Sequence, residues 1–278
     1  MGKLIDKLQQ VGKGGESGMG FARRASGQAP RPAAVLVALR ATDAAVAEAA
    51  AKNGADAVII TGWTPKTDVA PITKALASGG AATLWGVEVG ELDADASETL
   101  KAARTAGASF AIVPATAPAA ILFDEVEQFD RVVTLAQPDD QMALLLLRAA
   151  NALPVQAAFV RLDLSSAALA RLSVTDFTRL KLIAESLRFP LLVALPANEA
   201  PDATATNVLV RLGVDGVTLQ GTEASAESVG AQVKAVREQL EKTPAPKDSG
   251  DGPISVGGLM GMGGLRQATR PAPEPDEE

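Results

Sequence analysis

The sequence contains no histidine, no cysteine and no tyrosine among its 278 residues. Without cysteine the chain can form neither a disulfide framework nor a thiolate metal site, and without histidine it lacks imidazole ligands and imidazole general bases. Ser-His-Asp and Cys-His nucleophiles are excluded for the same reason. We therefore predict no metal site, and any catalysis must use carboxylates, amines, guanidinium groups or hydroxyls.

Aromatic residues are also scarce, at 3% of the chain, and 26 basic against 33 acidic residues give a net charge of −7. With few stacking platforms and no basic stripe, nucleic acid is not an expected partner. No run of about 18 apolar residues occurs, and Lys3, Asp6 and Lys7 interrupt the apolar N-terminal residues. Neither a membrane span nor a signal peptide is predicted, so we expect a cytoplasmic protein without a membrane partner.

The composition changes near both ends of the chain. Residues 12–32 are rich in glycine and serine and lack periodicity, which is typical of a flexible connector, and their basic residues, Arg31 among them, are expected to be solvated. Residues 243–278 form a Gly- and Pro-rich stretch with an acidic end, which predicts a disordered tail. The predicted organisation is an N-terminal helix and linker (1–32), a folded domain (33–242) and this tail (243–278).

Between these flanks one pattern recurs: a short apolar run, a polar turn and an amphipathic stretch. The runs are apolar on both faces, as expected for parallel strands buried between helices and a core. The amphipathic stretches begin with capping residues such as Thr42-Asp43, and three end at a glycine that can adopt a left-handed conformation, at Gly54, Gly107 and Gly213. The predicted strands are Ala33–Leu39, Asp56–Gly62, Thr83–Val89, Phe110–Ala115, Arg131–Ala136, Ala157–Asp163, Pro190–Pro196 and Gly216–Gly221.

Eight βα units in succession are the number that closes a parallel sheet into a barrel, with all helices outside because the crossovers are right-handed. The sequence therefore predicts an α/β fold, a (β/α)8 TIM-type barrel with short loops over residues 33–242. A doubly wound open sheet is the alternative. It would carry a glycine-rich phosphate turn after its first strand, whereas Arg40 to Asp43 contains no G-x-G-x-x-G motif.

The leading helix has an apolar stripe made of Leu4, Ile5, Leu8 and Val11. An apolar stripe of this kind needs a partner surface. We predict that it either plugs the amino end of the barrel or pairs with another subunit, in which case the protein would be a homo-oligomer.

In a (β/α)8 barrel the chemistry is located at the carboxyl ends of the strands. Alternate residues of a strand face the same side, so residues two apart, such as Arg161 and Asp163, share a face. Trp63, which follows the second strand, is expected to line the pocket. The pattern predicts a polar mouth that contains Arg40, Glu88, Arg161, Asp163, Thr218 and Gln220.

Two interpretations of these charged residues stay open. In the first, Glu88 or Asp163 acts as a general base, and Arg161 with Arg40 anchors an anionic substrate, since guanidinium groups bind carboxylate or phosphate bidentately. In the second, Arg161 forms an ion pair with Asp163 or Glu88 that fills the top of the barrel and performs no chemistry.

Two segments carry a resemblance. AVAEAAAKNGADAVIITG (45–62) and LVRLGVDGVTLQG (209–221) resemble the helix-turn-strand units of phosphate-binding (β/α)8 barrels, the broad aldolase-type group that includes thiamine-phosphate synthases, indole-glycerol-phosphate synthases and FMN-dependent nitronate monooxygenases. The resemblance covers two of the eight units and implies no specific family. It implies that Gly221 and Thr222, beside Gln220, belong to a phosphate-binding loop. No cofactor is assigned.

The sequence leaves two classes of function. The first is a lyase- or isomerase-type enzyme that acts on a small phosphorylated or carboxylated metabolite. The second is a non-catalytic barrel that serves as a scaffold or ligand sensor. It would contact a protein partner through the leading helix or through the methionine-containing tail segment 259–265, because flexible methionines adapt to partner surfaces.

Overall fold

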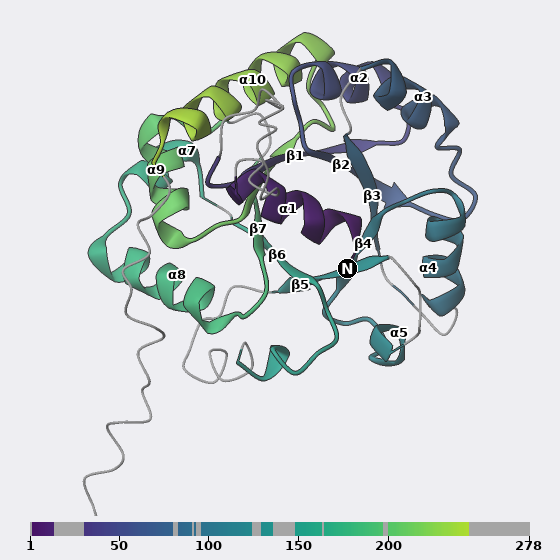
Figure 1. The fold of residues 1–278 in the computed structure, drawn as a ribbon, viewed down its shortest axis with the longest axis horizontal. Helices are drawn as coiled ribbons and strands as arrows, with labels where there is room; N and C mark the ends of the chain where they lie inside the picture. Colours follow the sequence, from purple (N-terminus) through teal and green to yellow (C-terminus); the bar gives the residue numbers. More distant parts are fainter. Residues whose placement is uncertain are drawn as a thin grey trace, which may run out of the picture. The chain divides into compact units, whose positions relative to one another are not determined.

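The computed structural model describes residues 2–13, 31–79, 83–90, 92, 96–123, 129–135, 148–162, 164–196 and 200–244. Within these ranges, eight parallel strands form a closed barrel in chain order, and β8 pairs with β1 (Figure 1). All the predicted strands are present, and the open-sheet alternative is wrong. The strands are β1 (Ala34–Arg40), β2 (Ala57–Trp63), β3 (Leu84–Val89), β4 (Phe110–Pro114), β5 (Asp130–Leu135), β6 (Ala157–Arg161), β7 (Leu191–Ala194) and β8 (Gly216–Gln220).

Helices that follow the strands surround the barrel, as right-handed crossovers require (Figure 1). Their apolar faces pack on the outward-facing residues of the strands. The helices with described bounds are α2 (Ala44–Lys52), α3 (Ala70–Ser78), α4 (Ala96–Thr105), α5 (Ala120–Phe123), α7 (Ser166–Ala170), α8 (Val174–Ser186), α9 (Ala203–Leu212) and α10 (Ala226–Lys242).

The helix ends follow the capping chemistry of the sequence in most cases. Gly54, Gly107 and Gly213 have φ angles of 88°, 99° and 88°, which confirms the predicted left-handed turns. The side chain of Ser225 accepts a hydrogen bond from the Ser228 N–H at the start of α10. Asp43 differs, because its carboxylate accepts from the Arg40 N–H (3.0 Å) instead of capping α2.

The barrel interior holds a core of its own, separate from the two outer clusters between strands and helices. The side chains in it come from alternate positions of each strand, as the pleat requires. Phe159 and Phe110 are the largest of them, and both are buried. The buried interior residues of the strands are Ala34, Leu36, Ala38, Ala57, Ile59, Phe110, Ile112, Val132, Ala157, Phe159, Leu192 and Ala194.

The leading helix α1 (Lys3–Lys13) closes the amino end of the barrel, and Figure 1 shows it lying across the opening. Leu4, Ile5, Leu8 and Val11 are buried in the interior core. The carboxylate of Asp130, at the start of β5, accepts a hydrogen bond from the Leu4 N–H (2.8 Å) at the first turn of α1. Of the two predicted roles of this stripe, the structure shows the plug at the amino end of the barrel.

The expectation that Arg31 is solvated is wrong. Only 2% of Arg31 is exposed, and its guanidinium donates to the Asp56 carboxylate at 2.9 Å. Its backbone N–H also donates to the Val11 carbonyl at the end of α1 (3.0 Å). The position of Arg31 beneath α1, next to the buried acid that precedes β2, explains why composition alone misassigned it.

A repeated hydrogen-bond pair joins neighbouring strands at the amino end of the barrel. The residue just before a strand accepts from a backbone N–H of the preceding strand through its side chain, while its own N–H donates to a carbonyl there. Asp56 makes this pair with β1, Gln156 with β5 and Asp215 with β7, with side-chain bonds of 2.9, 2.7 and 2.8 Å. The Asp of each Gly-x-Asp junction, at Asp56 and Asp215, therefore aligns two strands.

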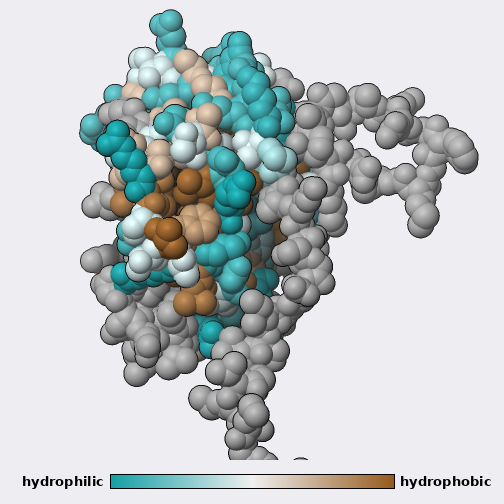
Figure 2. Space-filling model, turned by 90° about the vertical axis from the view of Figure 1, so that its left-hand side faces the viewer, coloured by the Kyte–Doolittle hydropathy of each residue, from teal (hydrophilic) through white to brown (hydrophobic). Residues whose placement is uncertain are grey.

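Figure 2 shows the face on which α7, α8 and α9 lie, where apolar surface gathers among polar residues. Phe177 and Leu180 of α8 pack against the outer cluster of this side. Val174 and Leu182, on the same helix, are 83% and 38% exposed. Helix α8 thus has apolar side chains on its exposed side as well as on its packed side.

Burial raises the pKa of Asp215 above 3.8, although the hydrogen bond from the Leu191 N–H acts in the opposite direction. The folded protein therefore holds this proton to a higher pH than the unfolded chain, and stability falls as pH rises from about 4 through the raised pKa. Asp215→Asn removes the titratable carboxyl and with it this pH-dependent contribution to stability. We expect the melting temperature of the wild type minus that of the variant to decrease between pH 3.5 and 6. A constant difference across this window would contradict the assignment.

Removing the Leu4 side chain should destabilise the whole barrel, because this side chain is 1% exposed within the interior core. Leu4→Ala is expected to lower the free energy of unfolding by about 2–4 kcal/mol in urea titrations. Gln9→Ala, on the exposed side of α1, is the matched control and should change it by less than about 0.5 kcal/mol. Equal effects of the two variants would show that α1 is not part of the core.

Candidate functional site

The carboxyl ends of the strands carry polar side chains at the positions that continue the interior pattern. Arg40 follows Leu36 and Ala38 on β1, Arg161 follows Phe159 on β6, and Gln220 follows Thr218 on β8. Glu88 has the same parity on β3, and its register partner on β4 is the interior residue Ile112. Barrel closure therefore gathers these predicted residues at one opening, opposite the end closed by α1.

The centre of this rim is an ion pair between Glu88 and Arg161. Strands β3 and β6 are three steps apart around the barrel, so the contact spans the opening. The Arg161 guanidinium also lies over the Phe159 ring, 5.6 Å from its centroid, within the range of a cation–π contact. The Glu88 side chain is 18% exposed and that of Arg161 is 52% exposed, so solvent reaches the guanidinium.

This contact is the ion pair foreseen in the non-catalytic interpretation, but its exposure leaves the anion-binding interpretation open as well. Half-exposed ion pairs contribute little net stability, because water solvates the separated charges. An incoming carboxylate or phosphate can form the same charge-assisted hydrogen bonds to Arg161 that Glu88 forms now.

A second, looser ion pair lies at the edge of the rim. Arg40 Nη2 and Glu223 Oε1 are 3.6 Å apart, and their side chains are 59% and 72% exposed. Glu223 follows β8, so the pair joins the ends of β1 and β8. At this exposure the interaction holds neither partner firmly.

The loop after β8 contains the residues that the resemblance assigns to a phosphate site. Gly221 is buried, and its N–H donates to the Ala38 carbonyl at 2.7 Å. A Cβ at this position would lie 3.2 Å from that carbonyl oxygen, so close packing accounts for the glycine. Gln220 and Thr222 are half-buried. Their roles, like that of Gly221, stay predictions.

Asp163, the second predicted catalytic carboxylate, lies outside the described residues, as does the tail segment 259–265. In the described part of the chain, no three acidic side chains gather as potential ligands of a metal ion. None of the described helices combines the length and apolar character needed to cross a bilayer.

The prediction that Trp63 lines the pocket is wrong. Trp63 is 4% exposed and packs in the outer cluster between the strands and helices. The register of β2 against β3 is irregular between Ile60 and Trp63, and Gly62 has a φ of 64°. Such a bulge shifts the alternation of side chains by one residue, which turns the indole away from the interior.

Thr218 is a residue whose importance the sequence alone did not reveal. Its alternation with Gln220 predicted an inward direction, but not that its hydroxyl would be completely buried. The structure places the side chain at 0% exposure, with no hydrogen-bond partner for Oγ1 among the described residues.

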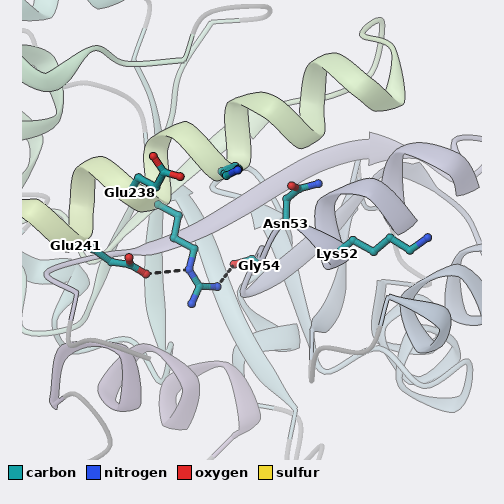
Figure 3. A pocket seen from close by; sticks show the side chains of 7 residues that line it. Lys52, Asn53, Gly54, Glu238 and Glu241 are labelled. Carbon is teal, nitrogen blue, oxygen red and sulfur yellow. Dashed lines mark hydrogen bonds and ion pairs between the residues drawn. The ribbon is translucent and has the colours of Figure 1, made fainter. Parts of the chain in front are cut away.

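A groove of about 410 Å³ lies on the outside of the barrel between the end of α2 and α10 (Figure 3). Arg237 crosses it, donating to the Gly54 carbonyl and to Glu241, both at 3.1 Å. The cations and carboxylates that line the groove largely neutralise one another. The bond from Arg237 to Gly54 connects α10 to the end of α2. The lining residues of the groove are Lys52, Asn53, Gly54, Lys234, Arg237, Glu238 and Glu241.

The closed ring of eight parallel strands with its outer helices defines the protein as a (β/α)8, or TIM-type, barrel. No protein-family profile matches the chain. No curated protein sequence matches it either.

Solved structures do share the fold. Thiamine phosphate pyrophosphorylase from Pyrococcus furiosus has 13% identity, covers 76% of this chain and 97% of its own, and has a TM-score of 0.52. A ligand-free tryptophan synthase from M. tuberculosis has 14% identity over 87% of this chain and 100% of its own, with a TM-score of 0.53. A Rubisco-like protein from Rhodopseudomonas palustris has 16% identity, covers 85% of this chain and 67% of its own, and has a TM-score of 0.56. At such low identities the similarity concerns the fold.

The strength of the Glu88–Arg161 contact can be measured with a double-mutant cycle of Glu88→Gln and Arg161→Ala. Because half of the Arg161 side chain is exposed, we expect a coupling free energy of about 0.2–1 kcal/mol in urea titrations, decreasing at 0.5 M salt. A coupling above about 3 kcal/mol, insensitive to salt, would mark a structural ion pair that a ligand could not replace.

Proposed function

We propose that the protein is a lyase- or isomerase-type enzyme that binds a small phosphorylated or carboxylated metabolite at the carboxyl rim of its barrel. The observation that carries this proposal is the Glu88–Arg161 ion pair, which combines a solvent-accessible guanidinium with a carboxylate at the barrel opening. The fold adds support, because one barrel that shares it is, by its name, a thiamine phosphate pyrophosphorylase.

Binding would proceed by exchange of anions. The substrate's carboxylate or phosphate takes the place of Glu88 on the Arg161 guanidinium, so the cation remains paired throughout. The exposed pair of Arg40 with Glu223 can open at little cost, which makes Arg40 a second anchor. Gln220 and Thr222 contact the substrate from the β8 side of the rim, while the Gly221 N–H stays bonded to the Ala38 carbonyl.

Release of Glu88 from Arg161 supplies the chemistry. The freed carboxylate lies beside the bound anion, where it can take a proton from a neighbouring carbon of the substrate. In an isomerase it returns that proton to an adjacent carbon, and in a lyase it gives the proton to the departing group. Asp163, two residues beyond Arg161 in the sequence, is proposed as the second acid–base group.

The second candidate function is a non-catalytic barrel that acts as a scaffold or ligand sensor. The observation that favours it is the same ion pair, because the paired Glu88 and Arg161 satisfy each other's charge without a substrate. The two functions share the anion site and differ in turnover. Proton NMR of a bound candidate substrate in D2O separates them, since an enzyme of this type exchanges a carbon-bound proton for deuterium and a sensor does not.

Anion binding is tested by thermal melting in the presence of phosphate, glycerol 3-phosphate and succinate. Because ligands that bind only the native state stabilise it, saturation with a bound anion should raise the melting temperature by about 5–10 °C. Arg161→Ala should abolish the rise. Glu88→Gln should strengthen anion binding several-fold, because the competing carboxylate is neutralised, and should abolish proton exchange.

Arg104→Ala is the matched control, because Arg104 lies in the last turn of α4 and is exposed. This variant should retain the full ligand-induced rise. An equal rise in the wild type and in Arg161→Ala would remove Arg161 from the site, and no rise with any of the anions would refute the proposed substrate class.

A further inference from the structure

Among the described residues, the barrel interior contains a buried hydroxyl without a hydrogen-bond partner. Thr218, on β8, is 0% exposed, and its Oγ1 has no hydrogen-bond partner among the described residues. Most buried polar atoms in proteins are hydrogen-bonded, because burial removes their bonds to water. The hydroxyl of Thr218 therefore calls for an explanation outside the packing of the chain.

Another buried threonine of the same protein shows the contrast. Thr206, on α9, is also 0% exposed, but its hydroxyl is hydrogen-bonded to the side-chain amide of Gln239 at 2.8 Å. In that case the hydroxyl connects two helices. Thr218 makes no such connection within the described residues, so its hydroxyl has no comparable structural role.

The row of interior residues below Thr218 is closely packed. Phe159, Leu192 and Gly216 are register partners across β6, β7 and β8. A Cβ on Gly216 would lie 2.6 Å from Cδ2 of Leu192 and 2.9 Å from Cδ1 of Leu36, so this row has no room for even one methyl group. Side chains therefore fill the space around Gly216, and α1 closes the barrel beyond it, so the carboxyl rim is the open side nearest to Thr218.

The next row toward the rim is different. Arg161, Ala194 and Thr218 are register partners there, so the guanidinium and the hydroxyl share one row on either side of an alanine. On the other side of β8, Thr218 pairs with Leu36 of β1, and Ala38 pairs with Gln220 one row nearer the rim. Strands β6 and β8 are two strand spacings apart, about 10 Å. Along this row, the single small side chain of Ala194 thus lies between the guanidinium-bearing residue and the buried hydroxyl.

From this arrangement we propose that the Thr218 hydroxyl binds an oxygen substituent of the small anion that Arg161 holds. The inference rests on the proposed function and names its substrate class: a short-chain carboxylate or phosphate ester with a hydroxyl or carbonyl group a few bonds from the charge. A threonine hydroxyl can donate to a carbonyl or accept from a hydroxyl, so it fits both forms. An analogue that lacks this oxygen leaves the buried hydroxyl unpaired, so the analogue binds more weakly.

The test compares two pairs of probes that differ by hydroxyl groups: glycerol 3-phosphate with n-propyl phosphate, and 3-hydroxybutyrate with butyrate. One pair carries a phosphate and the other a carboxylate. In the pair whose anionic group matches that of the natural substrate, isothermal titration of the wild type should show at least about tenfold tighter binding of the hydroxylated member. Thr218→Val keeps the shape of the side chain and should bind both members with the affinity of the deoxy compound. Thr218→Ser should restore the preference.

A ligand-free measurement provides the control. Thr218→Val should melt at or above the temperature of the wild type, whereas Thr206→Val, which breaks the bond to Gln239, should melt lower. A loss of stability in Thr218→Val as large as that in Thr206→Val would show that the hydroxyl has a partner in the protein and would overturn the inference.

The ligand outcomes separate this inference from the proposed function. If the wild type binds both members of a pair equally, and Arg161→Ala abolishes both, the anion site stands and the role of Thr218 is wrong. If Thr218→Val keeps the wild-type preference, the role of Thr218 is likewise wrong. If the wild type binds no probe at all, the proposed function fails together with the inference.

Discussion

Closure of the hydrogen-bonded ladder between β8 and β1 is the constraint on which the other features depend. In an open sheet, the two faces of each strand would meet different layers of helices, and residues of β3 and β6 could not meet across an interior. In the closed ring, alternate residues share one enclosed volume. Glu88 and Arg161 therefore contact each other although 73 residues separate them in sequence.

The two ends of the barrel use charge in different ways. At the amino end, the ionic groups are buried and tied to the backbone: Arg31 pairs with Asp56, and Asp130 holds the first turn of α1. Burial raises the pKa of Asp130, although the N–H groups of Leu4 and Ile5 favour its charged form. At the carboxyl end, Arg40 pairs with Glu223 and Arg161 with Glu88, and both arginines are more than half exposed. The buried ionic groups at the amino end stabilise the fold, whereas the exposed arginines at the carboxyl end can exchange their carboxylate partners for a ligand.

The fold was predictable from sequence because both of its signals are local. Apolar runs of strand length and glycine junctions such as Gly213 recur along the chain, and each can be recognised without knowing its neighbours. The plug formed by α1 was foreseen as one of two alternatives, since an apolar stripe shows that a partner surface is needed but not which one. The bulge that turns Trp63 outward depends on pairing with β3, which is not visible in the sequence of β2.

The position of Glu88 and Arg161 at the carboxyl rim could be predicted from the sequence, whereas their contact was foreseen only as one of two alternatives. Strand alternation was sufficient to place Glu88 and Arg161 at the rim, but whether they touch depends on the distance across the closed ring. Burial of Arg31 and the absence of a described partner for Thr218 depend on packing between distant segments. Such properties arise from tertiary contacts, which composition and periodicity do not encode.

The helix across the amino opening also determines how molecules travel. Because Leu4 and Leu8 are inserted among the interior side chains, the amino end of the barrel is closed and only the carboxyl end is open. Whatever reaches the depth of Thr218 must leave by the route it entered, so a new molecule cannot follow until the previous one has departed. For the proposed enzyme, a single opening means that the product has to leave before the next substrate enters, so retained product would act as an inhibitor.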